Sequence, residues 1–440
     1  MSPSLASILG LVVMFIVGTA LPINMGALAF ALAFLVGTVF VGMTANNILA
    51  GFPGDLFVTL VGITYLFAIA QKNGTIDLLV HWAVRAVGGR VAAIPWVMFG
   101  VAAVLTAVGA VSPAAVAIIA PIALRFARHY RIDPLMMGLL VIHGAQGGGF
   151  SPISIYGGIT NQIVDRAGLP GNETALFLAS LFFNLAVAVG VFFAFGGAKL
   201  LGRRDTGTHE EFEEGSRASV PVTGHGGTPA APRDGDHPHL TRATRDQILT
   251  LAGLLILGVG SLAFGLNVGM VAITIAVLLA LLSPTAQKGA IDKVSWSTVL
   301  LIAGVITYVG VLQKSGAIDM VSNSVAGLGA PLLAALLLCY IGGVVSAFAS
   351  SVGVLGAIIP LAVPFLAGGE IGAVGMIASL AISATIVDVS PFSTNGALVV
   401  ANAAEDERDK LFRRFLIYSG LVVVGGPALA WAVLIVPGWL

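Results

Sequence analysis

Long runs of apolar residues alternate with short polar connections along almost the whole chain. In the first half the runs cover about residues 5–21, 23–44, 54–71, 92–127, 134–165 and 174–200. In the second half they cover about residues 246–266, 268–283, 295–313, 331–366, 371–403 and 412–436. A membrane-spanning helix needs roughly 20 apolar residues. The pattern therefore predicts an all-α polytopic membrane protein with room for about ten crossings.

One long polar segment, residues 203–245, separates the two sets of runs. It contains HEEFEEG and GTPAAPRDGDHPH and has no helical or strand period. We expect a disordered cytoplasmic linker between a first domain at 1–202 and a second at 246–440. A metal-binding tract is the alternative for its acidic and histidine residues, but no regular spacing fixes them relative to one another.

The two halves of the chain resemble each other. QKNGTID at 71–77 aligns with QKSGAID at 313–319, an offset of 242 residues, and Asn24-x-Gly26 aligns with Asn267-x-Gly269. Farther along, an offset of 239 residues pairs Ser112 with Ser351, Pro121 with Pro360, Ser151-Pro152 with Ser390-Pro391, and Ser154 with Ser393. Chance similarity of two apolar sequences is the alternative. Several small polar matches at one offset favour an internal repeat.

The run at 92–127 is too long for one crossing and too short for two. Basic residues flank both of its ends: Lys72, Arg85, Arg90, Arg125, Arg128 and Arg131. By the positive-inside rule, both ends are cytoplasmic. Its middle reads GAVSP and carries no charge. We therefore predict a re-entrant hairpin that turns inside the membrane, and a matching hairpin at 331–366 that enters from the outside.

The run at 134–165 is interrupted by GGGFSP at 147–152. We interpret it as a broken helix, and the repeat predicts a second broken helix at 371–403, interrupted by DVSPFSTN at 388–395. Each repeat then has five crossings plus one hairpin, and an odd number of crossings inverts the second repeat relative to the first. Both termini are expected to be external, and only Arg166 and Lys314 among the basic residues fall outside with them.

Composition and charge agree with this picture. Hydrophobic residues make up 57% of the chain and charged residues 10%, where soluble domains average about 25% charged. The 21 basic and 21 acidic residues balance, so no basic excess points to nucleic acid. Cys339 is the only cysteine, which excludes an intramolecular disulfide and a cysteine-rich metal site. No basic residue precedes the first apolar run, which favours a first membrane helix over a cleaved signal peptide.

Inverted repeats with paired hairpins and broken helices are typical of secondary transporters, whose site lies near the midplane where the repeats meet. Free N–H groups at a half-helix start suit an anion, and free C=O groups at a half-helix end suit a cation. No Lys or Arg lies deep in a predicted span, so backbone, hydroxyl and amide groups must hold an anionic substrate. Close packing is the alternative role for small residues of this kind.

The candidate substrate ligands are hydroxyl and amide side chains at these interruptions: Ser112, Ser151, Ser154, Ser351, Ser393, Thr394 and Asn395. The candidate cation ligands lie at the hairpin tips and at the broken-helix loops: Ser112, Gly148, Gly149, Ser151, Ser350, Ser351, Asp388 and Ser390. Apart from a coupling cation, expected to be sodium, we expect no cofactor.

Asp388 is the one acidic side chain that we place well inside a span. A buried carboxylate there costs several kcal/mol unless it is paired, protonated or bound to a cation. We interpret it as a cation ligand or a coupling proton carrier; the alternative is a carboxylate satisfied by helix N-termini. His143 is either a hydrogen-bonded packing residue or a functional group. Asp77 and Asp319 are interpreted as caps of short interfacial helices at 76–89 and 317–327.

The whole pattern resembles the ion-transporter superfamily, which includes the divalent anion/sodium symporters, and more closely the MatC-type dicarboxylate (malonate) carriers. The resemblance covers nearly all of the chain except 203–245. It rests most on NMGALAFALAFLVG, LFAIAQKNGTIDLLV and HGAQGGGFSPISIYG. It implies sodium-coupled uptake of a small dicarboxylate, such as malonate or succinate, by an elevator motion. It also implies a homodimer in the plasma (inner) membrane.

The hairpin tips depart from the symporters, in which each tip carries Ser-Asn-Thr. Here the tips read VSP at 111–113 and SSV at 350–352, so only the serine positions carry over. The loops at Ser151-Pro152 and Ser390-Pro391 match the family's broken-helix loops in position. Two other functions stay open. One is a sodium/proton antiporter that uses Asp388, although such exchangers commonly keep more than one intramembrane acid. The other is a membrane-embedded enzyme, for which His143 and Asp388 alone offer little.

Overall fold

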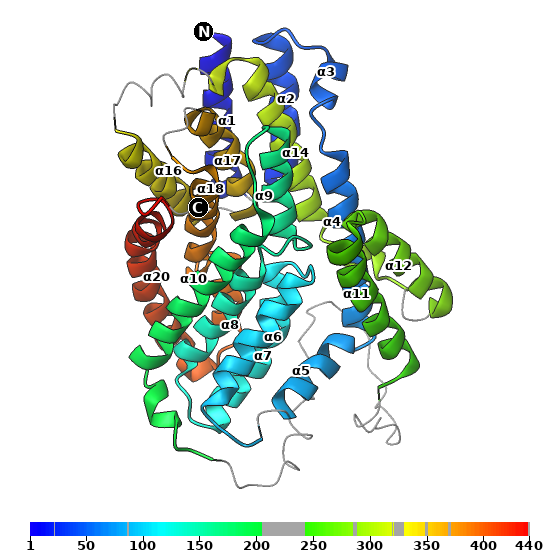
Figure 1. The fold of residues 1–440 in the computed structure, drawn as a ribbon, viewed down its shortest axis with the longest axis vertical. Coiled ribbons are helices and arrows are strands. Elements are labelled where there is room, and N and C mark those ends of the chain that lie inside the picture. Colours follow the sequence, from blue (N-terminus) through cyan, green and yellow to red (C-terminus); the bar gives the residue numbers. More distant parts are fainter. Residues whose placement is uncertain are drawn as a thin grey trace, which may run out of the picture.

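The computed structural model describes residues 1–21, 23–85, 88–204, 243–284, 288–318, 320, 330–347, 351–367 and 371–438. These residues form an elongated bundle of helices (Figure 1). The first half contains α1 (Pro3–Ala20), α2 (Met25–Val39), α3 (Ala45–Leu49), α4 (Gly54–Lys72), α5 (Thr75–Arg85), α6 (Ala93–Ala107), α7 (Ser112–His129), α8 (Pro134–Gly148), α9 (Ile155–Arg166), α10 (Glu173–Ala194) and the 3-10 turn η1 (Gly197–Leu200).

The second half runs through a similar series of elements. It contains α11 (Arg245–Phe264), α12 (Val268–Leu282), η4 (Ile291–Lys293), α14 (Trp296–Lys314), α16 (Pro331–Ser346), α17 (Ser351–Ala367), α18 (Ala373–Ile386), η5 (Val387–Val389), α19 (Thr394–Ala401) and α20 (Glu405–Leu434).

The helices have the length and surface of a membrane bundle. Within the described residues, six segments are long and apolar enough to cross a membrane, and six shorter apolar helices accompany them. Large apolar side chains face outward, among them Phe264 and Leu281, which are 73% and 72% exposed. Contiguous apolar surface of this kind marks contact with lipid or a partner. The expectation of an all-helical polytopic membrane protein is confirmed.

The helices are interrupted where the sequence indicates. α6 and α7 are separated by residues 108–111, α8 and α9 by 149–154, and α18 and α19 by η5 and 390–393. The first break begins later than GGGFSP suggests, because 147 and 148 stay helical. Gly148 lies against α6, and an added Cβ there would come 1.9 Å from the Ala103 carbonyl oxygen. That glycine therefore permits close helix packing rather than breaking the helix.

The ends of the expected linker are ordered. The Arg203 carbonyl accepts a hydrogen bond from the Val91 N–H at 3.3 Å, and Arg204 forms a bridge with Arg90. At the far end, Thr244 and Gln247 form a capping box that starts α11. The interior, 205–242, lies outside the described residues, as do Asp319 and most of the expected helix at 317–327. α5 begins one residue earlier than expected.

The two halves interlock through glycines. α2 packs on α14, and α12 packs on α4. A Cβ on Gly26 would lie 2.0 Å from the Leu300 carbonyl oxygen, and a Cβ on Gly304 would lie 2.1 Å from the Gly26 carbonyl oxygen. At the other crossing, a Cβ on Gly62 would come 2.6 Å from the Gly269 carbonyl oxygen. The backbones touch at both crossings, so the bundle depends on residues that have no side chain.

A second pair of contacts joins the halves in the same reciprocal manner. Ser4 Oγ, near the start of α1, donates to the Ser315 carbonyl at 2.8 Å. Gln247 Nε2, near the start of α11, donates to the Asn73 carbonyl at 3.2 Å. In both cases the first helix of one half bonds to the turn after α4 or α14 of the other half. These matched contacts agree with the internal repeat that the sequence predicts.

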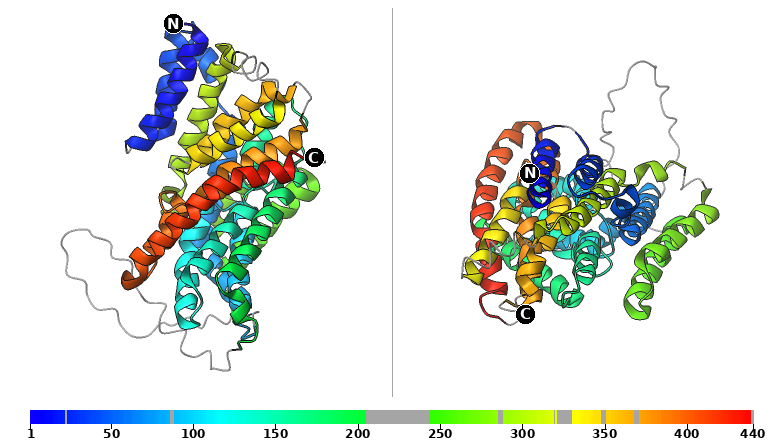
Figure 2. Two further views of the ribbon diagram at one scale, coloured as in Figure 1. Left: turned by 90° about the vertical axis from the view of Figure 1, so that its left-hand side faces the viewer. Right: turned by 90° about the horizontal axis from the view of Figure 1, so that it is seen from above.

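The first segments of the two broken helices, α8 and α18, are each surrounded by other helices. α8 packs against α6, α7 and α10, and α18 packs against α16, α17 and α20. Nearly every residue of α8 and α18 is buried, which explains why both sequences are apolar on all faces. In the left view of Figure 2, α1 and α2 lie to one side of the helices that surround α8 and α18.

A substitution at the glycine crossing tests the interlocked packing. Replacing Gly26 with Ala places a methyl group against backbone that has no room to rotate away, so we expect a loss of about 1–3 kcal/mol. Gly100→Ala in α6 is the matched control, because nothing lies within 4 Å of its Cβ position. Thermal unfolding in detergent should show a lower melting temperature for the Gly26 variant alone. Equal melting of both variants would show that the crossing is loose.

Candidate functional site

Four helices begin at buried serines. Ser112 and Ser351 are the first residues of α7 and α17, and Ser154 and Ser393 are the N-caps of α9 and α19. All four side chains are at most 5% exposed. A helix start presents free N–H groups and a partial positive charge. Each such start within the core is a donor group suited to an anion.

The first hairpin tip is bonded to both broken helices. Asn395 Nδ2, in the first turn of α19, donates to Ser112 Oγ at 2.9 Å. Ser151 Oγ, in the first broken-helix loop, donates to the Ala107 carbonyl at 2.5 Å. We call Ser112, Ser151 and Asn395 the first-tip cluster. Asn395 Oδ1 is buried without a hydrogen-bond partner, so this cluster keeps one free acceptor oxygen.

A chain of hydroxyl groups leads from the second hairpin to Asp388. Ser346 Oγ donates to Ser351 Oγ at 2.8 Å, and Ser351 Oγ donates to Asp388 Oδ1 at 2.5 Å. We call Ser346, Ser351 and Asp388 the second-tip cluster. Among the Asp, Glu, Lys and Arg residues that the structure describes, Asp388 alone is buried. Asp388 is therefore the one buried carboxylate of the described residues, and its depth within a membrane stays a prediction.

The two broken-helix loops have the same internal hydrogen bonds. Ser154 Oγ donates to the carbonyls three and five residues before it at 2.6 and 2.5 Å. Ser393 Oγ does the same at 2.7 and 2.5 Å. A Cβ on Gly157 or Gly396 would come 2.0 or 2.1 Å from a loop carbonyl oxygen. Both serine protons are used within the loops, which favours a loop-shaping role over direct substrate contact.

Two residues of the site were not identified from the sequence. Tyr156, in the first turn of α9, is buried. Its side chain interacts with that of Ser112 and experiences the electrostatic field of Asp388. A Cβ on Gly149 would lie 3.0 Å from the Tyr156 ring. The repeat offset pairs Tyr156 with Asn395, which was the available signal. Tyr156 therefore lies beside the first-tip cluster.

Gln146 is the second of these residues. Its Nε2 donates to the Thr385 carbonyl at 2.7 Å, and the repeat offset pairs these same two positions. A contact between paired positions marks the place where the two halves meet. Gln146 Oε1 is buried without a partner, so a second free acceptor oxygen lies beside the first broken helix.

The remaining predicted residues have varied surroundings. Gly148 packs on α6, as described above, and Gly149 ends α8. Ser390 Oγ accepts from the Phe392 N–H at 3.3 Å. Thr394 is exposed in the first turn of α19. Ser350 lies outside the described residues, so its predicted role rests on the sequence alone.

The buried His143 belongs to a closed network. Its Nδ1 lies 3.0 Å from Asn184 Oδ1, and its Nε2 lies 3.0 Å from the Tyr418 hydroxyl. Because an amide oxygen only accepts, Nδ1 carries the proton and Nε2 accepts from Tyr418. Both ring nitrogens are engaged by the protein. Of the two interpretations, the hydrogen-bonded packing residue fits this geometry.

Comparison with known families finds a match in the first part of the chain. Residues 1–149 match the family model described as the N-terminus of the dicarboxylate carrier protein MatC. The first 149 residues of the chain are therefore similar to the MatC-type dicarboxylate carriers. This match indicates a carrier protein rather than an enzyme. The matched range runs from α1 to Gly149, where the first broken helix is interrupted. No curated protein matches the chain.

The bond between Ser112 and Asn395 should contribute measurably to the stability of the protein. Ser112→Ala leaves the buried Asn395 Nδ2 without an acceptor, which costs about 1–3 kcal/mol. Ser419→Ala is the matched control, because Ser419 is also buried but donates only to the Leu416 carbonyl of its own helix. Thermal unfolding should separate the two variants. If Ser419→Ala melts as low as Ser112→Ala, the bond between the halves has no special importance.

Proposed function

We propose that this carrier is a secondary active transporter of a small dicarboxylate of the malonate or succinate class, driven by sodium. The main support is the MatC match together with four buried helix starts. The starts of α7 and α19 are joined by the bond from Asn395 to Ser112, and the start of α17 is joined to Asp388 through Ser351. The proposal includes an elevator mechanism, a homodimer and a plasma (inner) membrane location. The two halves would be inverted repeats, with the hairpins at 92–127 and 331–366 entering from opposite sides.

The balance of charges supports a site that binds an anion together with a cation. Each helix N-terminus contributes about +0.5 of an elementary charge, so four of them roughly match one dianion. Asp388 adds one further negative charge to the same site. Within the described residues no Lys or Arg is buried to offset it. A co-bound cation supplies the missing charge, which makes substrate and cation binding mutually favourable.

The oxygen atoms at the two tips differ in a way that suits two unequal cation positions. Hard cations bind oxygen ligands such as carboxylates, amides, hydroxyls and carbonyls. The second-tip cluster offers the Asp388 carboxylate beside Ser351. The first-tip cluster offers the free Asn395 Oδ1 beside Ser112, with Gly149 in the position that the repeat pairs with Asp388. Sodium at the first tip would therefore bind neutral oxygens alone.

The packing also supports the elevator part of the proposal. The glycine crossings of α2 with α14 and of α4 with α12 bring backbones into contact and suit a rigid scaffold. The hairpins and broken helices pack mainly on one another and on α10 and α20. A group of helices with its own core can move as a body against such a scaffold.

The antiporter alternative makes a different prediction. An exchanger would use Asp388 to carry protons against sodium and would need no organic anion. The hydroxyl groups and helix starts around Asp388 favour a dicarboxylate instead. A sodium gradient that changes the internal pH of vesicles without any dicarboxylate would support exchange.

Uptake into proteoliposomes tests the proposed substrate and coupling. Labelled malonate or succinate should accumulate when sodium is higher outside, and accumulation should fall when potassium replaces sodium. Liposomes without protein are the control. Absence of uptake and counterflow of both dicarboxylates, with or without a sodium gradient, would contradict the proposed function.

Asp388→Asn tests the role of the carboxylate. Losing one charged ligand should raise the sodium concentration for half-maximal uptake roughly tenfold, which corresponds to about 1.4 kcal/mol. Asp165→Asn is the matched control, because Asp165 is exposed at the end of α9. Ser112→Ala should reduce uptake without changing the pH profile, since it removes a neutral ligand.

The same experiment has a clear negative outcome. If Asp388→Asn transports with unchanged sodium dependence and unchanged pH dependence, Asp388 is a structural residue. A change in pH dependence with no change in sodium dependence would instead favour a proton carrier.

A further inference from the structure

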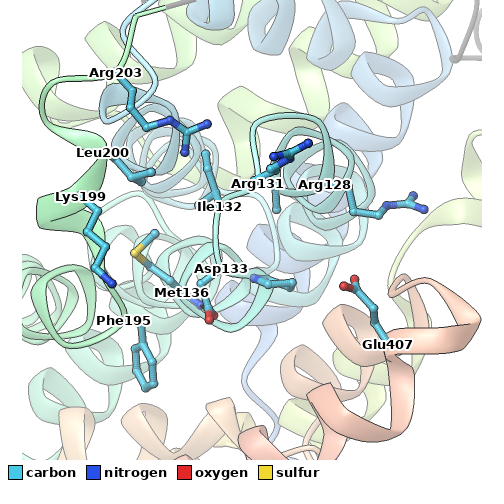
Figure 3. A pocket seen from close by; sticks show the side chains of 13 residues that line it. Arg128, Arg131, Ile132, Asp133, Met136, Phe195, Lys199, Leu200, Arg203 and Glu407 are labelled. Carbon is cyan, nitrogen blue, oxygen red and sulfur yellow. Dashed lines mark hydrogen bonds between the residues drawn. The ribbon is translucent and has the colours of Figure 1, made fainter.

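A cavity of about 610 Å³ lies away from the proposed transport site, at the C-terminal ends of α7 and α10 and the N-terminal ends of α8 and α20. Figure 3 shows its lining from close by. Its basic side chains come from two segments. Arg128 and Arg131 lie at and just after the end of α7, and Lys199 and Arg203 lie in and just after η1. The positive-inside rule accounts for their presence but not for their gathering around one cavity.

The cavity has an excess of positive charge. The four basic side chains face two acidic ones, Asp133 and Glu407. Asp133 is already neutralised, because Arg414 Nη2 lies 2.8 Å from its Oδ2. Arg128, Arg131 and Lys199 form no ion pair within the described residues. With Asp133 paired to Arg414, the four basic side chains of the lining face only Glu407, so the cavity has a net excess of three positive charges.

The backbone around the cavity is held in place. Arg203 Nη2 donates to the Tyr130 carbonyl at 2.7 Å, which ties the η1 segment to the end of α7. Arg131 has φ 51°, the one positive φ of a non-glycine residue in the described chain. A helix end in this conformation usually carries glycine. An arginine at this position places a long cationic side chain on the cavity wall, although the positive φ is unfavourable for a residue with a side chain.

The cavity lies at a boundary between apolar and polar surface. α10 is a candidate span that ends at Ala194, and the lining begins at Phe195. Next to it, Phe193 and Leu201 are 57% and 65% exposed. Buried Ile132, Met136 and Leu200 form its apolar wall. A cationic cavity at the end of a span, flanked by exposed apolar side chains, lies where lipid headgroups are concentrated.

We propose that this cavity binds the phosphate of an anionic phospholipid headgroup, with Arg128, Arg131 and Lys199 as its ligands. Guanidinium and ammonium groups are the usual partners of phosphate in proteins. Bound lipid would join the ends of α7, α10 and α20 and stabilise that side of the bundle. This role is independent of dicarboxylate transport.

The test uses the purified full-length protein in a neutral detergent. Thermal unfolding is measured while phosphatidylglycerol, phosphatidylcholine or inorganic phosphate is added. Phosphatidylglycerol should raise the melting temperature of the native protein, while phosphatidylcholine and phosphate should not. The double variant Arg128→Gln/Lys199→Gln should need at least about tenfold more phosphatidylglycerol for the same stabilisation, since it lacks two charge-assisted hydrogen bonds.

The matched control is Lys410→Gln/Arg413→Gln, which removes the same charge from exposed positions on α20 outside the cavity lining. It should respond to phosphatidylglycerol as the native protein does. Equal responses of the two double variants would overturn the proposal, because general charge would then explain binding. Stabilisation by inorganic phosphate that matches phosphatidylglycerol would overturn the lipid assignment and identify a soluble anion. Melting in the absence of additive shows whether each variant is folded.

Discussion

The fold depends on satisfying polar backbone where helices are broken inside an apolar bundle. In such surroundings an unpaired N–H or C=O costs several kcal/mol. Each broken helix meets this constraint with one serine, Ser154 or Ser393, whose hydroxyl donates to two carbonyls of its own loop. Glycines at 157 and 396 leave room for those carbonyls. Because these carbonyls are hydrogen-bonded within their own loops, helix starts and other polar groups nearby remain available to a ligand.

The two halves build the site together. The first hairpin meets the second broken helix through Ser112 and Asn395, and Gln146 meets its paired position Thr385. The glycine crossings of α2 with α14 and of α4 with α12 join the halves a second time. The pairing is not symmetric in chemistry, because Asp388 stands where the first half has Gly149. One similar framework therefore surrounds a site that is charged on one side and neutral on the other.

The sequence predicted the interruptions well because Gly, Pro and Ser in an apolar run have a direct backbone effect. It also predicted that Asp388 would be the deep carboxylate, since hydropathy is sensitive to single charges. It did not predict which side chains meet. Tyr156 was missed because an aromatic residue reads as apolar, and Gly148 was taken as a ligand although it serves packing on α6. The bond from Asn395 to Ser112 depends on how the two halves pack together, and the periodicity of the sequence does not predict that packing.

The central claim is that a dicarboxylate binds where the two tips and the two broken helices meet. The most direct test is an experimental structure of the full-length carrier with malonate and sodium. The account predicts density for the dianion between the first-tip and second-tip clusters, in contact with the starts of α7 and α17. Density for malonate elsewhere, for instance among Arg128, Arg131 and Lys199, with none between the tips, would contradict it.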